Sequence, residues 1–236
     1  LPIQPTAHYS MGGIPTDKFG QVITDAEGTH VKGFFAAGEC SCVSVHGANR
    51  LGTNSLLEAV VFGERAGKSA FEYAKTVDHA PVNESHEKTK VLEQFEGIFQ
   101  QNGDESYNDI RNQMKKVMTE NCSVFREEKQ LKTCIETIEK LQEKFKNGKI
   151  TDKGKLFNTE IYEILELENM LAMAEIIAKG ALDRKESRGG HYRIDYPKRD
   201  DKNFLKHSLA YKTDDGIEIK HKPVVITKHQ PAERTY

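Results

Sequence analysis

The chain has 236 residues, 37 % of them hydrophobic and 30 % charged, with no tryptophan; this length allows one or two domains with a buried core. Its formal net charge of −2 argues against nucleic acid as the main partner, because nucleic-acid-binding domains carry a basic excess. No run approaches the roughly 18 apolar residues of a membrane span, we recognise no signal peptide, and four cysteines are too few for a disulfide framework, which favours a reducing compartment.

Residues 1–80 are predicted to form an α/β region. Glycines and acidic residues at 12–13 and 25–28 indicate turns, and short strands are expected at 21–23 and 31–37. The apolar run 33–37 ends in Gly38-Glu39, as a buried strand does when its carboxyl end faces a ligand in an open α/β sheet. Glu39 is then either an acceptor for ribose-type hydroxyls or an ordinary surface glutamate.

A polar, glycine-punctuated loop at 46–52 leads directly into a helix predicted from about Thr53 to Lys75. Unpaired N–H groups and the macrodipole make a helix start attractive to anions, and Arg50 adds a fork of donors that matches a carboxylate or phosphate. Arg50 is therefore either part of an anion site or an arginine that stabilises its own loop. The helix carries apolar residues around much of its circumference, which predicts that it is buried.

Residues 81–187 are predicted to form a three-helix bundle without chemistry of its own, with turns near 101–104 and 147–154, because apolar residues recur there at three- and four-residue spacing. Residues 188–236 are predicted to be a tail, with a loop rich in Arg, His, Asp and Gly and then one or two strands at 209–212 and 224–226. His221 and His229 are expected to be solvated.

Other motifs for chemistry are weak or absent. Cys40 and Cys42 have one residue between them instead of the two of a zinc knuckle, so no metal site is predicted. The sequence contains no Walker-type phosphate loop, no Ser-His-Asp signature and no glycine-rich dinucleotide fingerprint. His8 lies among hydroxyl residues and glycines at 5–13, where it is either a donor to a carboxylate or a satisfied loop histidine.

Three segments in this order, 5–13 (PTAHYSMGG), 38–39 (GE) and 46–56 (HGANRLGTNSL), resemble the flavoprotein subunit of the succinate dehydrogenase and fumarate reductase family. The stretches 186–191 (ESRGGH) and 199–207 resemble that family's carboxyl-terminal region. The resemblance implies the carboxyl-terminal part of an FAD-binding α/β domain at 1–80, followed by the helical bundle and the tail. The wider group also includes L-aspartate oxidase, which remains the alternative enzyme.

The resemblance also implies roles for single residues. His8 and Arg50 match the residues that hold a carboxylate of succinate or fumarate against the flavin. Glu39 matches the residue that binds the FAD ribose, Ser55 and Leu56 match backbone contacts to the isoalloxazine ring, and Asn54 is expected to bind the cofactor with them. The chain begins without an initiator methionine, so we expect a fragment or processed piece whose missing amino-terminal half carries the proton-shuttling arginine. Such a piece is expected neither to retain FAD nor to turn over succinate alone.

The implied partners are an iron–sulfur subunit and membrane-anchor subunits, which would hold the protein at the cytoplasmic membrane without a transmembrane segment of its own. No role with nucleic acid is expected. A third hypothesis, from a different class, is a non-catalytic assembly module in which the bundle and tail dock an iron–sulfur subunit.

Overall fold

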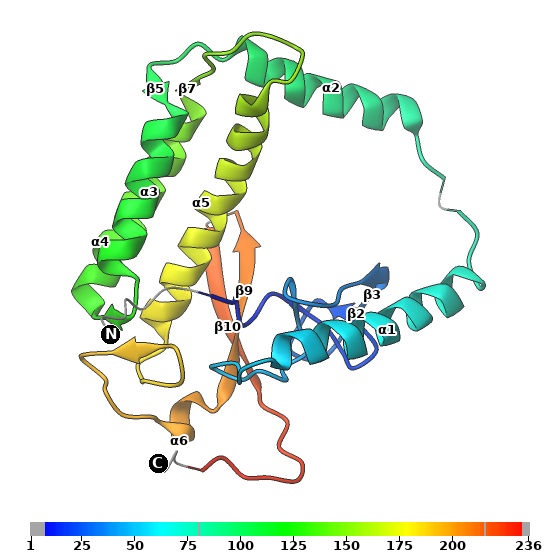
Figure 1. Ribbon diagram of the computed structural model, residues 1–236, viewed down its shortest axis with the longest axis vertical. Helices are drawn as coiled ribbons and strands as arrows, with labels where there is room; N and C mark the ends of the chain where they lie inside the picture. Colours follow the sequence, from blue (N-terminus) through cyan, green and yellow to red (C-terminus); the bar gives the residue numbers. More distant parts are fainter. Residues whose placement is uncertain (1–7, 80, 215, 233–236) are drawn as a thin grey trace.

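The computed structural model describes residues 8–79, 81–214 and 216–232, and these form six helices and ten strands (Figure 1). The helices are α1 (Asn54–Ala74), α2 (Glu84–Gln100), α3 (Tyr107–Asn121), α4 (Glu128–Lys146), α5 (Thr159–Asp183) and α6 (Asp201–Phe204). The strands are β1 (Ile14–Pro15), β2 (Gln21–Ile23), β3 (His30–Phe35), β4 (Ser41–Cys42), β5 (Glu105–Ser106), β6 (Phe125–Arg126), β7 (Gly148–Lys149), β8 (Tyr192–Arg193), β9 (Lys206–Thr213) and β10 (Gly216–Pro223). None of the helices in these ranges is both long and apolar enough to cross a bilayer.

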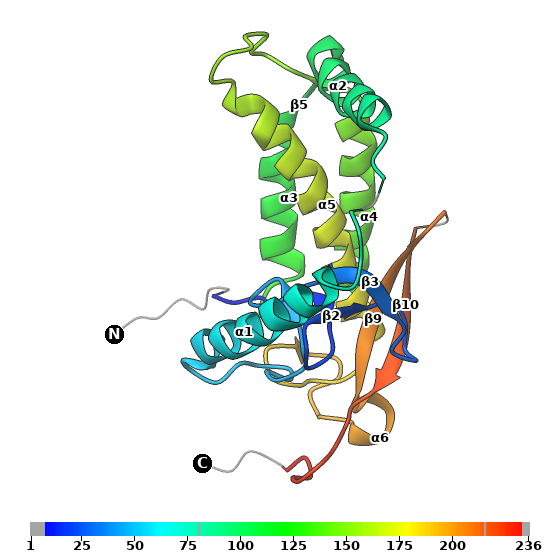
Figure 2. The same cartoon turned by 90° about the vertical axis from the view of Figure 1, so that its right-hand side faces the viewer.

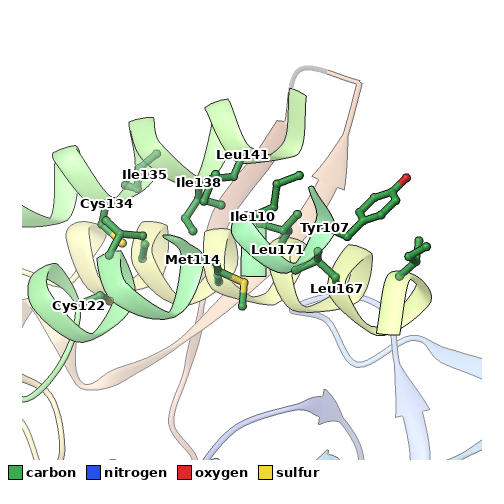
Figure 3. Close-up of a cluster of buried hydrophobic side chains, with 14 of the residues drawn as sticks. Tyr107, Ile110, Met114, Cys122, Cys134, Ile135, Ile138, Leu141, Leu167 and Leu171 are labelled. Atoms are coloured by element: carbon green, nitrogen blue, oxygen red, sulfur yellow. The ribbon is translucent and has the colours of Figure 1, made fainter. Parts of the chain in front are cut away.

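The main hydrophobic core lies between α3, α4 and α5, which run side by side (Figures 1 and 2). Their inward positions recur every three or four residues, so each helix turns one apolar stripe to the other two. Figure 3 shows these side chains meeting: Ile110 and Met114 from α3; Cys134, Ile135, Ile138 and Leu141 from α4; Leu167 and Leu171 from α5. The bundle is therefore held by apolar packing.

The number of helices in the bundle region differs from the prediction. Four helices, α2 to α5, replace the expected three, because the chain also breaks at 122–127 between α3 and α4. No proline or glycine marks this break; β6 within it pairs in parallel with β8, 67 residues later in sequence. Only Ile98 near the end of α2 is buried in the core, and the rest of α2 extends away from the bundle (Figure 1).

The α/β region is smaller and more open than the predicted sheet. β2 and β3 form an antiparallel pair, and β1 and β4 form a separate two-residue parallel pair. The expectation of a buried strand at 33–37 is wrong: β3 ends at Phe35 and Phe34 is half exposed. Among the described elements, β3 has its main contacts with its partner strand β2 and with α1, where Tyr73 lies against Phe35 with ring centroids 6.2 Å apart.

Helix α1 has the predicted span but not the predicted burial. Only Glu58 and Ala66 on it are buried, whereas Leu56 and Leu57 are 72 % and 62 % exposed. One face of the helix lies beside β2 and β3 (Figure 2), and no other described element covers the remaining apolar face. The apolar residues around α1 therefore predicted a second packing partner for the helix, and the described residues do not provide one.

The tail forms a longer hairpin than predicted. β9 pairs antiparallel with β10 along its full length and packs beside α5, so the second strand covers 216–223 instead of 224–226. His221 was expected to be solvated, but its Nε2 lies 2.8 Å from Asp183 Oδ2 and the side chain is partly buried. His229 is exposed, as predicted.

Candidate functional site

Three segments that are distant in sequence meet around Arg50. The guanidinium carbon of Arg50 lies 4.7 Å from the centroid of the Tyr9 ring, and the backbone N–H of Ser10 donates to Glu39 Oε1 at 3.0 Å. The stretch around Tyr9 therefore contacts both the 46–50 loop and Glu39, which lies between β3 and β4. His8, the other residue predicted to hold substrate, is exposed and directly precedes Tyr9.

Arg50 leaves most of its donors unused. Its Nη1 donates to the carbonyl of Leu51 at 3.3 Å, while Nε is buried without a hydrogen-bond partner among residues 8–79, 81–214 and 216–232. No carboxylate pairs with it among the described residues. A buried guanidinium N–H without a partner is costly, so this geometry favours an anion site over a role confined to the loop.

The start of α1 is also left open. Thr53 is the N-cap residue with φ 66°, but its side chain makes no capping bond, because Oγ1 donates back to the Gly52 carbonyl at 2.6 Å. No acidic side chain lies in the first turn, where Asn54, Ser55 and Leu56 stand. Among the described residues, no side chain caps the positive end of the helix dipole or places a negative charge in its first turn, which suits an electron-rich ligand.

Glu58 and His46 complete this cluster and were not predicted from the sequence. Glu58 Oε2 accepts a hydrogen bond from the Tyr9 hydroxyl at 2.9 Å and lies 2.7 Å from His46 Nε2. Burial, together with the hydrogen bond to Glu58, raises the pKa of Tyr9 to about 12, so the hydroxyl keeps its proton and donates. The available signal was a single acidic residue within the apolar run Leu56 to Phe62.

The tail holds the 46–50 loop from another direction. Gly190 N–H donates to the Ala48 carbonyl at 3.0 Å, and Ser44 Oγ lies 3.3 Å from His207 Nε2. Gly189 has φ +59°, and a Cβ there would come within 2.5 Å of the Ala48 carbonyl group. Only glycine allows this close approach, so the tail helps to define the loop that carries Arg50.

No group of three or more His, Cys, Asp or Glu side chains within the described ranges is arranged to hold a metal ion, and the four cysteines are free thiols.

A family model for the fumarate reductase flavoprotein C-terminus matches residues 111–236, which is more than half of the chain. The chain belongs to the succinate dehydrogenase and fumarate reductase flavoprotein family. An FAD-binding domain model matches residues 1–56, including His8, Glu39 and Arg50.

Relatives within this flavoprotein family align along the whole chain. The fumarate reductase flavoprotein subunit of Haemophilus influenzae is 41 % identical over 100 % of this chain and 39 % of its own length. The succinate dehydrogenase flavoprotein subunit of Rickettsia bellii is 41 % identical over 100 % of this chain and 41 % of its own length. The chain thus spans about two fifths of these relatives.

Solved structures of the family agree with this fold. Quinol fumarate reductase of Escherichia coli matches with a TM-score of 0.89 and 42 % identity, over 99 % of this chain and 39 % of that one. Sdh1 of Mycobacterium smegmatis matches with a TM-score of 0.80 and 28 % identity, over 93 % of this chain and 36 % of that one. The mixed α/β fold of this chain is therefore that of the flavoprotein's carboxyl-terminal part.

Buried ion pairs link the bundle of this flavoprotein piece to its tail. The side chain of Glu186 is fully buried and accepts from Arg184 at 2.7 Å, from Arg188 at 2.8 Å and from the Asp200 N–H at 2.8 Å. Arg188 also pairs with Asp201 at 2.6 Å. The region is a loop, as the sequence predicted, and these pairs make it an ordered support for Gly189 and Gly190.

His191 lies in the same support and makes its stability pH-dependent. Burial, together with the nearby Arg126 guanidinium, lowers its pKa from 6.5 to about 4, and its Nδ1 lies 2.9 Å from Arg126 Nη1. The imidazole of His191 takes up a proton below about pH 6.5 in the unfolded chain, but only near pH 4 in the folded chain. The stability from neutral His191 is therefore complete above pH 6.5 and is lost as the pH falls towards 4, about 2 kcal/mol of it by pH 5.

Urea unfolding followed by circular dichroism at pH 7.5 and pH 5 checks this expectation. His191→Gln is the matched variant, because an amide can still donate to the Arg184 carbonyl but does not titrate. The wild-type chain should lose about 2 kcal/mol more than the variant between the two pH values. Equal losses in both proteins would assign the pH dependence to other groups.

Proposed function

We propose that this chain is part of an enzyme that interconverts succinate and fumarate with FAD and exchanges electrons with an iron–sulfur subunit and quinone. The observation that carries the proposal is Arg50, whose buried Nε has no partner in the part of the chain that the structure describes. Arg50 stands in the HGANRLG segment of a chain that belongs to the succinate dehydrogenase and fumarate reductase family.

Arg50 and His8 are proposed to bind one carboxylate of the substrate. A guanidinium can grip a carboxylate through two parallel N–H donors, and Arg50 has such donors unoccupied. His8 adds a donor from the segment whose Tyr9 ring lies under Arg50. Holding the substrate in one orientation accounts for a large share of rate enhancement in enzymes.

The residues present also fit FAD. Glu39 is exposed four residues after the end of β3 and can accept from ribose hydroxyls. At the start of α1 the backbone N–H of Ser55 is available to a ligand, whereas that of Leu56 already donates to the Thr53 carbonyl at 3.1 Å. When bound, FAD supplies the site that takes up or returns a hydride. The positive end of the α1 dipole is proposed to stabilise the negative charge that accompanies this transfer.

The exposed apolar face of α1 is proposed to pack against further parts of the flavoprotein. Leu56, Leu57 and Val60 form this face, and the relatives are about two and a half times as long as the aligned region, since the chain covers 39 % of the Haemophilus relative. Contiguous exposed leucine and valine side chains typically mark an interface. The iron–sulfur and membrane-anchor subunits are proposed partners of the complete complex.

The test is dicarboxylate-dependent redox activity of the complete flavoprotein loaded with FAD. We expect succinate to reduce the flavin, malonate to compete with it, and L-aspartate to leave the flavin oxidised. Reduction by L-aspartate, with iminoaspartate as product, would reassign the protein to the L-aspartate oxidase branch. Binding of an iron–sulfur subunit without any flavin uptake would favour the assembly-module hypothesis instead.

A further inference from the structure

Glu58 is a buried carboxylate on a helix that is otherwise mostly exposed. Its residue surface is 4 % accessible, and an ionised carboxylate tolerates burial only when donors compensate for the lost water. Two partners compensate Glu58. Its Oε2 accepts a hydrogen bond from the Tyr9 hydroxyl at 2.9 Å and lies 2.7 Å from His46 Nε2. One oxygen of Glu58 thereby ties together the 8–10 segment, the 46–50 loop and α1.

The Tyr9 ring is fixed from two sides. Its hydroxyl is bonded to Glu58, and its ring meets the His46 ring edge-on, with centroids 5.4 Å apart and planes at 87°. Arg50 lies over this ring at 4.7 Å. Stacking on an aromatic face orients a planar guanidinium while leaving its N–H groups available to a ligand.

The backbone of the loop and the side chain of Arg50 have separate supports. Gly190 holds the Ala48 carbonyl from the tail, which fixes where the loop runs. The direction of the Arg50 guanidinium depends instead on Tyr9, since its hydrogen bond to Leu51 is long at 3.3 Å. Loss of the Tyr9 contact can therefore loosen Arg50 without displacing the loop.

We propose that Glu58 is a positioning residue for the dicarboxylate site: through Tyr9 and His46 it orients Arg50 towards the substrate carboxylate. This inference rests on the proposed function of Arg50. Glu58 does not touch the substrate in this account. Without it, the Tyr9 hydroxyl and His46 lose their shared acceptor, and Arg50 must be ordered at the moment of binding, which weakens binding.

The first experiment compares Glu58→Leu and Glu58→Gln in the complete FAD-loaded flavoprotein within its complex. Glu58→Leu should raise the KM for succinate about 10-fold with FAD content retained. Glu58→Gln should restore the KM to within about 3-fold of the wild-type value, because its amide oxygen still accepts from Tyr9. Glu64→Leu is the matched control: Glu64 lies on the same helix in an exposed pair with Lys68, and its KM should be unchanged.

A second pair of variants keeps the inference testable if Glu58→Leu fails to fold or to bind FAD. Tyr9→Leu removes the ring beneath Arg50, whereas Tyr9→Phe removes only the bond to Glu58. We expect a larger rise in KM from Tyr9→Leu. In an Arg50→Gln background, Tyr9→Leu should add almost nothing, because residues that act through one another are not additive.

Two results would overturn the inference while leaving the proposed function standing. One is a wild-type KM in FAD-loaded Glu58→Leu, and the other is a full additional loss from Tyr9→Leu in the Arg50→Gln background. If Arg50→Gln alone keeps the wild-type KM and kcat, the proposed function of Arg50 fails first. The Arg50 variant therefore distinguishes the two failures.

Discussion

Asp195→Ala is expected to destabilise the folded chain by about 3–5 kcal/mol, because it leaves the buried charge of Arg193 uncompensated. Arg193 is fully buried and forms two bonds of 2.7 Å to Asp195. The remaining Nη1 donates to carbonyls at the end of α5, at 2.9 Å to Ala181 and 3.2 Å to Leu182. Asp195 also accepts from the Glu128 N–H at the start of α4 at 3.0 Å, so one substitution loosens two helices.

Thermal unfolding followed at 222 nm measures this effect, and the midpoint should fall by about 10 °C. Glu64→Ala provides the control, since Glu64 pairs with Lys68 on the surface of α1 and exposed pairs add little stability. Its midpoint should not move measurably. A similar midpoint for Asp195→Ala and the control would mean that water or backbone carbonyls satisfy Arg193 without the carboxylate.

Arg50→Gln in the complete flavoprotein is expected to lower kcat/KM for succinate at least about 100-fold. Glutamine keeps a donor but loses the positive charge and the bidentate fork, so carboxylate binding and orientation are both lost. Arg50→Lys keeps the charge without the fork and should remain about 10-fold impaired or more. Steady-state kinetics with succinate, with FAD content measured for each variant, gives the result.

The control for Arg50 is a substitution in the same part of the molecule that leaves the predicted site intact. Lys68→Gln serves this purpose, because Lys68 is exposed on α1 and its one ion pair within the described ranges is with Glu64. Its kcat/KM should match the wild-type value. A wild-type kcat/KM in Arg50→Gln, with normal FAD content, would show that another residue binds the dicarboxylate.

Local patterns in the sequence located most of the helical segments but neither all of their ends nor their surroundings. The apolar periodicity located α1 and the bundle, because helix formation depends mainly on neighbouring residues. It did not reveal the break at 122–127, where a two-residue pairing of β6 with β8 ends the helix. It also predicted a buried α1, since a pattern cannot tell which segment will cover an apolar face.

For the site, the motifs named the candidate ligand donors and missed the buried residues that support them. His8 and Arg50 stand in recognisable glycine-rich segments, and their roles remain predictions. Glu58 looked like one more helical glutamate, and its contacts to Tyr9 and His46 come from segments 49 and 12 residues away. The same applies to Glu186. The sequence indicates only that it lies in a polar loop, and its buried pairs with Arg184 and Arg188 are seen only in the structure.

The attachment of the 46–50 loop to the tail has a consequence for how the site is made. Ser44 and His207 are 163 residues apart in sequence. Gly190 and Ala48, which share a backbone hydrogen bond, are also far apart in the chain. Contacts between such distant residues form slowly, because the intervening chain must first be ordered. During synthesis the Arg50 loop leaves the ribosome long before its support from the tail. We therefore expect the proposed ligand site to be completed late in folding, after the helical bundle has formed.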